Sequence, residues 1–260
     1  MKTMRRLFAM LCGVLLLLTL FGCSANPLRE YNAALNRTIE ETCYRQVLKM
    51  NATAIVDGTT IRVGIENNLI CSGNTAATYA AVGTGAATVS AAGDAVTPYR
   101  LYVRDGIYYY NYENYFADGS DYRYKLNSGF RDEEIISDLF PILVTDVESA
   151  KVQDENGKTV IAITVKDEKA VSVLNDTLSP MDRMLFGETA MSVVLKDLTI
   201  VTTLDGEGRV EQCTATVLGS TSYYGSYVSI LYVYDLVYSE YGTAPTPTFP
   251  DDLASYPNAE

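Results

Sequence analysis

Histidine and tryptophan are both absent from this chain of 260 residues. Without histidine, a Ser-His-Asp triad, a Cys-His pair and the usual His-containing zinc sites are excluded. The sequence also lacks a GxxxxGK[ST] loop, the motif that cradles phosphate groups. Only five cysteines occur, and their spacing fits no metal-binding motif. We therefore expect a protein that is not an enzyme and that has no catalytic residues, no metal site and no cofactor.

Basic residues are scarce relative to acidic ones. The chain has 20 Lys and Arg against 32 Asp and Glu, a net charge of −12. Such a chain is repelled by phosphate backbones, so nucleic acid is not an expected partner. Anionic lipid headgroups would repel it as well, so any attachment to a membrane requires an anchor other than charge.

One long segment near the start lacks charge altogether. Leu7–Gly22 follows a start that carries Lys2, Arg5 and Arg6. A basic start, a short apolar run and small residues at its end are typical of a secretory signal. The run is shorter than the ~20 residues of a membrane-spanning helix.

The residues LFGC at 20–23 resemble the lipobox of bacterial lipoproteins. In that family the cysteine thiol is diacylated, with acyl groups such as palmitate, and the chain is cut just before it. The resemblance implies a diacylglyceryl-type anchor on Cys23 and a location on the extracytoplasmic face of a cell membrane, where two acyl chains anchor a protein stably. The alternative is an ordinary secretory signal with an incidental cysteine. The lipobox interpretation divides the chain into a lipoprotein signal peptide (1–22), a single α+β lipoprotein domain (23–245) and an irregular, proline-containing tail (246–260).

The predicted domain begins with a helix. Asn26 and Pro27 are typical of an N-cap and a first turn, and Leu28, Tyr31 and Leu35 recur at helical spacing. Two more helical patterns cover 131–144 and 167–174, whereas the segment 178–186 is interpreted as a loop.

Between the helices, the period of the pattern is two, and four Asp-Gly pairs predict hairpins. They lie at 57–58, 105–106, 118–119 and 205–206. A two-residue loop at 57–58 places Val56 opposite Thr59, and one at 105–106 pairs Val103 with Tyr108 and Leu101 with Tyr110. A four-residue loop at the last site pairs Ile200 with Cys213 and Leu198 with Ala215, which makes Cys213 a buried free thiol. Further strands are expected at 122–126, on both sides of a turn at 155–157, and at 226–241.

The first hairpin also bears on cysteine pairing. Its two-residue loop places Tyr44 opposite Cys71 and points Cys43 to the other face, so a Cys43–Cys71 disulfide is disfavoured. A three-residue loop would place the two cysteines opposite each other. The two-residue loop is preferred because it aligns more apolar pairs on one face.

The order of a short helix, a long meander and two inserted helices resembles the LolA-, LppX- and LprG-like envelope lipoproteins. The matching sequences are LFGC at 20–23, LYVRDGIYYYN at 101–111 and PTFPDDL at 247–253. The resemblance implies an α+β fold: a strongly curved, mostly antiparallel sheet, like half of a barrel, with helices covering its concave face. It also implies an apolar cavity for acyl chains between the sheet and the helices.

Tyrosine is the one abundant aromatic residue, with nine of the 20 tyrosines between Tyr99 and Tyr124. Aromatic faces pack on acyl chains and stack on sugars, although tyrosine also simply suits half-buried strands. The apolar stripes of the helical segments are likewise either a cavity lining or ordinary core. The predicted ligand-binding residues are Leu101, Val103, Tyr108, Tyr110, Ile136, Leu139, Phe140 and Met184.

The function that this reasoning favours is that of a monomeric surface lipoprotein, held in the membrane by its anchor, that binds or transfers an apolar ligand. That ligand is a lipid, a lipopeptide or the acyl chains of a lipoprotein. The alternative is a non-catalytic envelope module that binds wall polymer or a protein partner through a tyrosine-rich sheet face. A hydrolase would require two facing carboxylates at a set separation.

Overall fold

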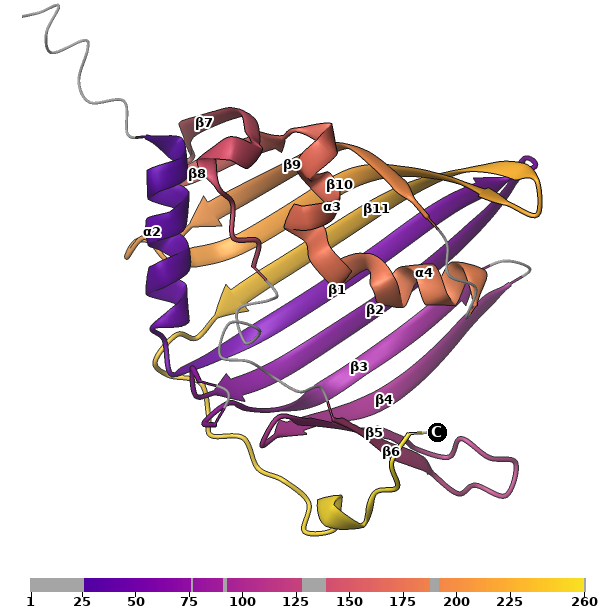
Figure 1. Cartoon of the computed structure of the whole chain (residues 1–260). Helices are drawn as coiled ribbons and strands as arrows, with labels where there is room; N and C mark the ends of the chain where they lie inside the picture. The colour runs from indigo at the N-terminus through magenta and orange to yellow at the C-terminus, as the bar shows by residue number, and fades with distance from the viewer. Residues whose placement is uncertain (1–25, 76, 91–92, 128–138, 188–191, 260) are drawn as a thin grey trace, which may run out of the picture.

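The computed structural model describes residues 26–75, 77–90, 93–127, 139–187 and 192–259. Eleven strands form one antiparallel sheet in the order β6-β5-β4-β3-β2-β1-β11-β10-β9-β8-β7. Their bounds are β1 Cys43–Val56, β2 Thr59–Ser72, β3 Ala80–Ser90, β4 Asp94–Arg104, β5 Ile107–Tyr112, β6 Tyr122–Asn127, β7 Val147–Glu155, β8 Lys158–Val165, β9 Val194–Leu204, β10 Val210–Tyr223 and β11 Ser226–Ser239. The sheet is open, because β6 and β7 form two separate edges, and it twists and curves (Figure 1). The predicted antiparallel sheet with helices is confirmed.

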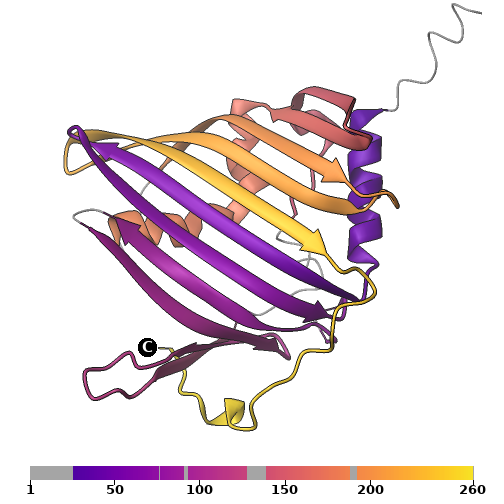
Figure 2. The same ribbon diagram turned by 180° about the vertical axis from the view of Figure 1, so that it is seen from behind.

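The three α-helices among the described residues lie on one side of this sheet, in front of it in Figure 1 and behind it in Figure 2. They are α2 Pro27–Ile39, α3 Asp167–Leu174 and α4 Ser179–Phe186, with 3-10 turns η2 Val144–Asp146, η3 Asn175–Leu178 and η4 Leu253–Ser255. We call the side of the sheet that carries the three α-helices the inner face. Alternate residues of each strand point to it, as in β11, where Ile230, Tyr232 and Tyr234 are buried.

Two hairpin registers agree with the sequence analysis. Val56 lies opposite Thr59, and Tyr44 lies opposite Cys71. Val103 lies opposite Tyr108, and Leu101 lies opposite Tyr110. The Asp and Gly of both loops have positive φ angles between 49° and 81°, as a type I′ turn requires. The cysteines among the described residues form no disulfide, which confirms the prediction for Cys43 and Cys71.

The predicted register between β9 and β10 is wrong by two residues. Cys213 lies opposite Thr202, not Ile200, and Ala215 lies opposite Ile200, not Leu198. The loop spans the five residues 205–209, and a bulge between Val210 and Gln212 adds a further shift. A shift of two keeps every side chain on its face, so Cys213 stays buried, and burial raises the pKa of its thiol to about 12.

The first and third predicted helices are confirmed as α2 and α3. The Asn26 side chain accepts hydrogen bonds from the backbone N–H groups of Leu28 and Arg29, both at 3.2 Å. The predicted loop at 178–186 is wrong, because α4 forms there with Pro180 in its first turn, where a missing N–H costs nothing. Of the predicted helix at 131–144, residues up to 138 lie outside the described residues. Residues 139–143 are not helical, since Pro141 disfavours a helical residue before it.

The C-terminal tail returns to the sheet and lines the edge of β6. The Lys125 N–H donates to the Pro257 carbonyl at 2.8 Å, and the Ala259 N–H donates to the Lys125 carbonyl at 2.9 Å. Leu253 and Tyr256 are buried against the outer side of β4 and β5. This arrangement protects one edge of the sheet from pairing with another chain.

Candidate ligand-binding face

The inner face of β4, β5 and β6, together with the loop that joins the last two strands, carries a continuous group of rings, which we call the aromatic wing. Its members are Tyr99, Tyr108, Tyr110, Tyr112, Tyr115, Phe116, Tyr122 and Tyr124. Strand pairing builds the group, because Tyr110 lies directly opposite Tyr124 and Tyr112 lies directly opposite Tyr122. The Tyr110 and Tyr124 rings stack with centroids 5.0 Å apart, and Tyr115 extends the cluster with its ring centroid 5.2 Å from that of Tyr122.

The exposed fraction of the side chains rises from the base of the wing, at Tyr99, to its rim, at Tyr115, Phe116 and Tyr122. Tyr99 is 7% exposed, whereas Tyr122, Phe116 and Tyr115 are 40%, 47% and 54% exposed. Leu126, on the same face of β6, is 42% exposed. The rim of the wing therefore presents apolar surface to its surroundings, whereas Tyr99 at its base belongs to the core.

The described helices pack elsewhere on the inner face. The α2 helix contacts β7, β8 and β10, α3 contacts β9, and α4 contacts β2 and β1. Between α4 and the wing lies β3, whose inward positions are Ala81, Gly83, Gly85 and Ala87. A Cβ atom on Gly85 would lie 2.4 Å from the Tyr99 ring, so glycine is required there for that ring to lie over the strand. Within the described residues, the inner face of β3 to β6 is thus lined by small residues and rings, without a helix packed over it.

Burial raises the pKa of several phenol groups in the wing. Desolvation raises the pKa of Tyr110 to about 12, and it raises the pKa of Tyr99 and of Tyr124 further. The Tyr99 hydroxyl donates to the Asn67 side-chain oxygen at 2.7 Å. The wing therefore offers neutral ring faces with hydroxyl groups at intervals, a surface suited to apolar or amphipathic ligands and not to acid–base chemistry.

The described carboxyl groups give no support to a hydrolase. Among them, Asp182 on α4 is the one whose pKa is raised, and burial is the cause. Its partner is the Tyr232 hydroxyl, which donates to it at 2.5 Å, and not a second carboxylate. In the part of the chain that the structure describes, no group of three His, Cys, Asp or Glu side chains is placed to hold a metal ion.

The predicted ligand-binding residues divide between two places. Leu101, Val103, Tyr108 and Tyr110 lie together, with the first two buried beneath the wing. The three others that can be placed lie beside the helices: Phe140 packs its ring 5.0 Å from the Tyr234 ring, Leu139 lines a small cavity beside Tyr44 and Tyr238, and Met184 belongs to α4.

Two predicted site residues, Ile136 and Cys23, lie outside the described residues. Tyr115 and Phe116 were not predicted to belong to this group of rings. Their position in the loop that follows β5, whose tyrosines already alternate, was the available signal.

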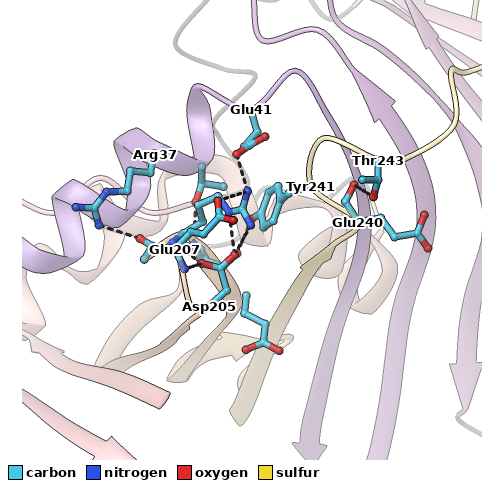
Figure 3. Close-up of polar contacts among 12 residues, drawn as sticks. Arg37, Glu41, Asp205, Glu207, Glu240, Tyr241 and Thr243 are labelled. Carbon is cyan, nitrogen blue, oxygen red and sulfur yellow. Dashed lines mark hydrogen bonds and ion pairs between the residues drawn. The ribbon is translucent and has the colours of Figure 1, made fainter. Parts of the chain in front are cut away.

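A second cluster, shown in Figure 3, joins the C-terminal end of α2 to the loop between β9 and β10. Arg209 forms ion pairs with Glu41 and Asp205, both at 2.8 Å, and its guanidinium lies 4.4 Å from the centre of the Tyr241 ring. Arg37 of α2 donates to a backbone carbonyl of the same loop at 3.2 Å. The residues are far apart in sequence, so pattern analysis did not find the cluster. Its partners satisfy one another, which indicates a role in holding α2 in place.

Comparisons with known proteins do not assign the chain to a family. No family model and no curated protein matches it. The crystal structure of LprF from Mycobacterium bovis is similar with a TM-score of 0.43 and 13% identity, over 87% of this chain and 98% of that one. A structure that describes lipid–protein interactions in lipovitellin is similar with a TM-score of 0.36 and 9% identity, over 81% of this chain and 26% of the lipovitellin chain. A beta-barrel-like protein of unknown function from Brucella abortus is similar with a TM-score of 0.24 and 8% identity, over 77% of this chain and 99% of that one.

Proposed function

We propose that this protein is a non-enzymatic, lipid-anchored surface protein of the cell envelope that binds an apolar ligand on the inner face of β3 to β6. The observation that carries the proposal is the aromatic wing, whose rim rings are about half exposed and have no described helix over them. The ligand is a lipid, or the acyl chains of a lipopeptide or lipoprotein.

Binding would consist of burying acyl chains between the wing and the helices. Each buried CH₂ group contributes about 0.8 kcal/mol of favourable free energy. Burial of a whole acyl chain would therefore offset the free energy that is lost when the ligand becomes ordered. Ring faces such as that of Tyr110 would pack along the chains. In this proposal the curved sheet and its helices enclose the ligand, and the protein either holds it or hands it over.

The anchor belongs to the same proposal. Diacylation of Cys23 would tether the domain to the extracytoplasmic face of a membrane. None of the described helices is long and apolar enough to cross a bilayer. A Cys23→Ser variant is expected to lose the acyl mass and to leave the membrane fraction. Unchanged acyl mass and unchanged partitioning in that variant would contradict the anchor.

A second candidate is a binding module for wall polymer or for a protein. The exposed rim at Tyr115 and Phe116 favours it, because flat aromatic surfaces also stack on sugars. The two candidates differ in their ligands: acyl chains need a deep apolar surface, whereas a sugar chain needs only the rim.

The test is a titration of residues 24–260 with a fluorescent fatty acid whose emission rises in apolar surroundings. We expect saturable binding that a Tyr122→Ser, Leu126→Ser double variant weakens at least about tenfold, since two apolar contacts are lost. The matched control is Tyr224→Ser, Tyr227→Ser, at two tyrosines that are 88% and 71% exposed in the turn between β10 and β11 and at the start of β11. Binding of wall-polymer fragments without any uptake of the fatty acid would favour the second candidate instead.

A further inference from the structure

A turn just before β7 exposes two neighbouring aliphatic side chains. Leu143 is 66% exposed and Val144 is 77% exposed. They are the two most exposed large aliphatic side chains among the described residues. We call this pair the aliphatic tip.

Hydrogen bonds hold the tip in one shape. The Asp146 carboxylate accepts from the Leu143 N–H at 3.1 Å, and the Asp146 N–H donates to the Leu143 carbonyl at 3.0 Å. From the end of β8, Lys166 donates through its amine to the Thr145 carbonyl at 2.9 Å and through its N–H to the Asp146 carbonyl, also at 2.9 Å. Asp146 itself is buried. The turn is therefore a built structure that presents its apolar side chains outward, and not a loop that exposes them for lack of contacts.

The tip lies beside the N-terminal half of α2. The Tyr31 hydroxyl, in the second turn of that helix, donates to the Phe140 carbonyl at 2.7 Å, three residues before Leu143. The α2 helix also contacts β7 and β8. In both views the start of α2 lies at the end of the molecule occupied by β7 and β8 (Figures 1 and 2).

The length of the intervening chain sets how far this end can be from an anchor at Cys23. Three residues separate Cys23 from Pro27, the first residue of α2. Fully extended, the four steps between these two residues span at most about 14 Å. An anchored Cys23 therefore keeps the start of α2 within that distance of the membrane surface.

We propose that the aliphatic tip is a second membrane contact, with Leu143 and Val144 inserted at the bilayer interface beside the anchor. This inference rests on the proposed acylation of Cys23. Two contacts, one covalent and one apolar, fix the orientation of the domain, which a single flexible anchor does not. The β6 edge is ten strand spacings from the β7 edge, about 48 Å along the sheet. The aromatic wing therefore lies at the opposite edge of the sheet from β7, the strand that follows the tip.

The absence of tryptophan from the chain allows a clean test. The Val144→Trp variant of the full-length, acylated protein is placed in phosphatidylcholine vesicles that contain brominated acyl chains. The matched control is Val96→Trp on β4, a valine that is 59% exposed. We expect a blue-shifted emission that bromine quenches at least about twofold for the first reporter, and an unquenched emission for the control. Intact mass measurement establishes whether Cys23 is acylated.

The outcomes separate the two proposals. Acyl mass on Cys23 with an unquenched reporter at position 144 overturns the tip contact and leaves the anchor standing. A protein without acyl mass on Cys23 overturns the proposed anchor, and the tip contact that rests on it is overturned as well.

A second measurement avoids the bulk of tryptophan. Transfer of the acylated protein between vesicles should be at least about tenfold faster for the Leu143→Ser, Val144→Ser double variant, because two aliphatic side chains no longer insert into the bilayer. Val96→Ser should not change the rate, and an equal change in both variants would also overturn the contact.

Discussion

The two halves of the inner face use the same strand pattern but are covered differently. In β7 to β11 with β1 and β2, inward residues such as Ile163 and Leu198 are fully buried beneath or beside the helices. In β3 to β6, inward rings become progressively exposed toward the rim at Tyr115. An alternating pattern thus specifies a sheet with one apolar face, but it does not specify what covers that face. In our proposal, the ligand binds the half over which the structure describes no helix.

The outer side of the wing shows that the exposure is not a sign of a poorly formed region. Tyr102 and Tyr109 are buried there by Leu253 and Tyr256 of the C-terminal tail. The Tyr109 and Tyr256 rings meet edge to face at 5.8 Å, and Arg123 lies over the Tyr256 ring. The tail supports β4 to β6 from behind and leaves their inner face open.

The largest effect is expected in the helix-covered half. Phe140→Ala removes a ring that is 1% exposed and should lower the free energy of unfolding by about 3–5 kcal/mol, because a cavity forms. Tyr122→Ala at the rim of the wing should cost about 1 kcal/mol or less. Urea unfolding of both variants measures the difference. Equal losses would show that the wing is packed as tightly as the rest of the core.

The next effect concerns the attachment of α2. Arg209→Met leaves Glu41 and Asp205 without their shared cation and should cost about 2–3 kcal/mol, less than for a fully buried pair, because these side chains are 17–22% exposed. Arg100→Met breaks an exposed pair with Glu113 and should cost about 0.5 kcal/mol. Thermal unfolding at low and high salt compares the two. A small loss for Arg209→Met would remove the argument that this cluster holds the helix.

A smaller and local effect is expected from the tail. Tyr256→Ser should cost about 2 kcal/mol, since a largely buried side chain is lost. The loss should appear as faster hydrogen exchange in β4 to β6, while β8 to β11 keep their protection. Tyr224→Ser, at a fully exposed ring, is the control. Faster exchange throughout the sheet would mean that the two halves are one cooperative unit.

The smallest effect is a pH dependence at α4. Burial raises the pKa of Asp182 above its ordinary value of 3.8, so the folded state favours the protonated form. The stability that protonation gives is fully present below the unfolded pKa and is lost as the pH rises through the folded value. Asp182→Asn, which still accepts from Tyr232, should therefore gain in melting temperature relative to the wild type as the pH rises above about 4. A relative loss over that range would reverse the assigned sign.

Much of the sheet was predictable, because the residues in its hairpin turns determine the pairing of the neighbouring strands. Asp57-Gly58 and Asp105-Gly106 set both loop length and register, and the alternation of Val103, Leu101 and Tyr99 set the face. The β3 strand was not predicted. Its inward glycines and alanines carry no hydrophobic period, and they are explained only by neighbours such as Tyr99, which lies over Gly85.

Features that depend on contacts between residues distant in sequence were harder to predict. The bulge beside Val210 shifted the β9–β10 register, and no residue type at that position predicts a bulge. The α4 helix was missed, although Pro180 lies in its first turn, where proline is common. Tyr108 and Tyr110 of the wing were identified from sequence, but the exposure of the wing depends on where the helices pack, and the whole fold determines that packing.

The most direct test of the central claim is native mass spectrometry with lipid extraction on residues 24–260, produced without the anchor. The account predicts a co-purifying species with acyl chains. That species should be lost in the Tyr122→Ser, Leu126→Ser variant, whose fold is retained, and kept in Tyr224→Ser, Tyr227→Ser. A clean apo mass, with no uptake of added lipid, would contradict apolar ligand binding and leave the wing as a binding surface for wall polymer or a protein.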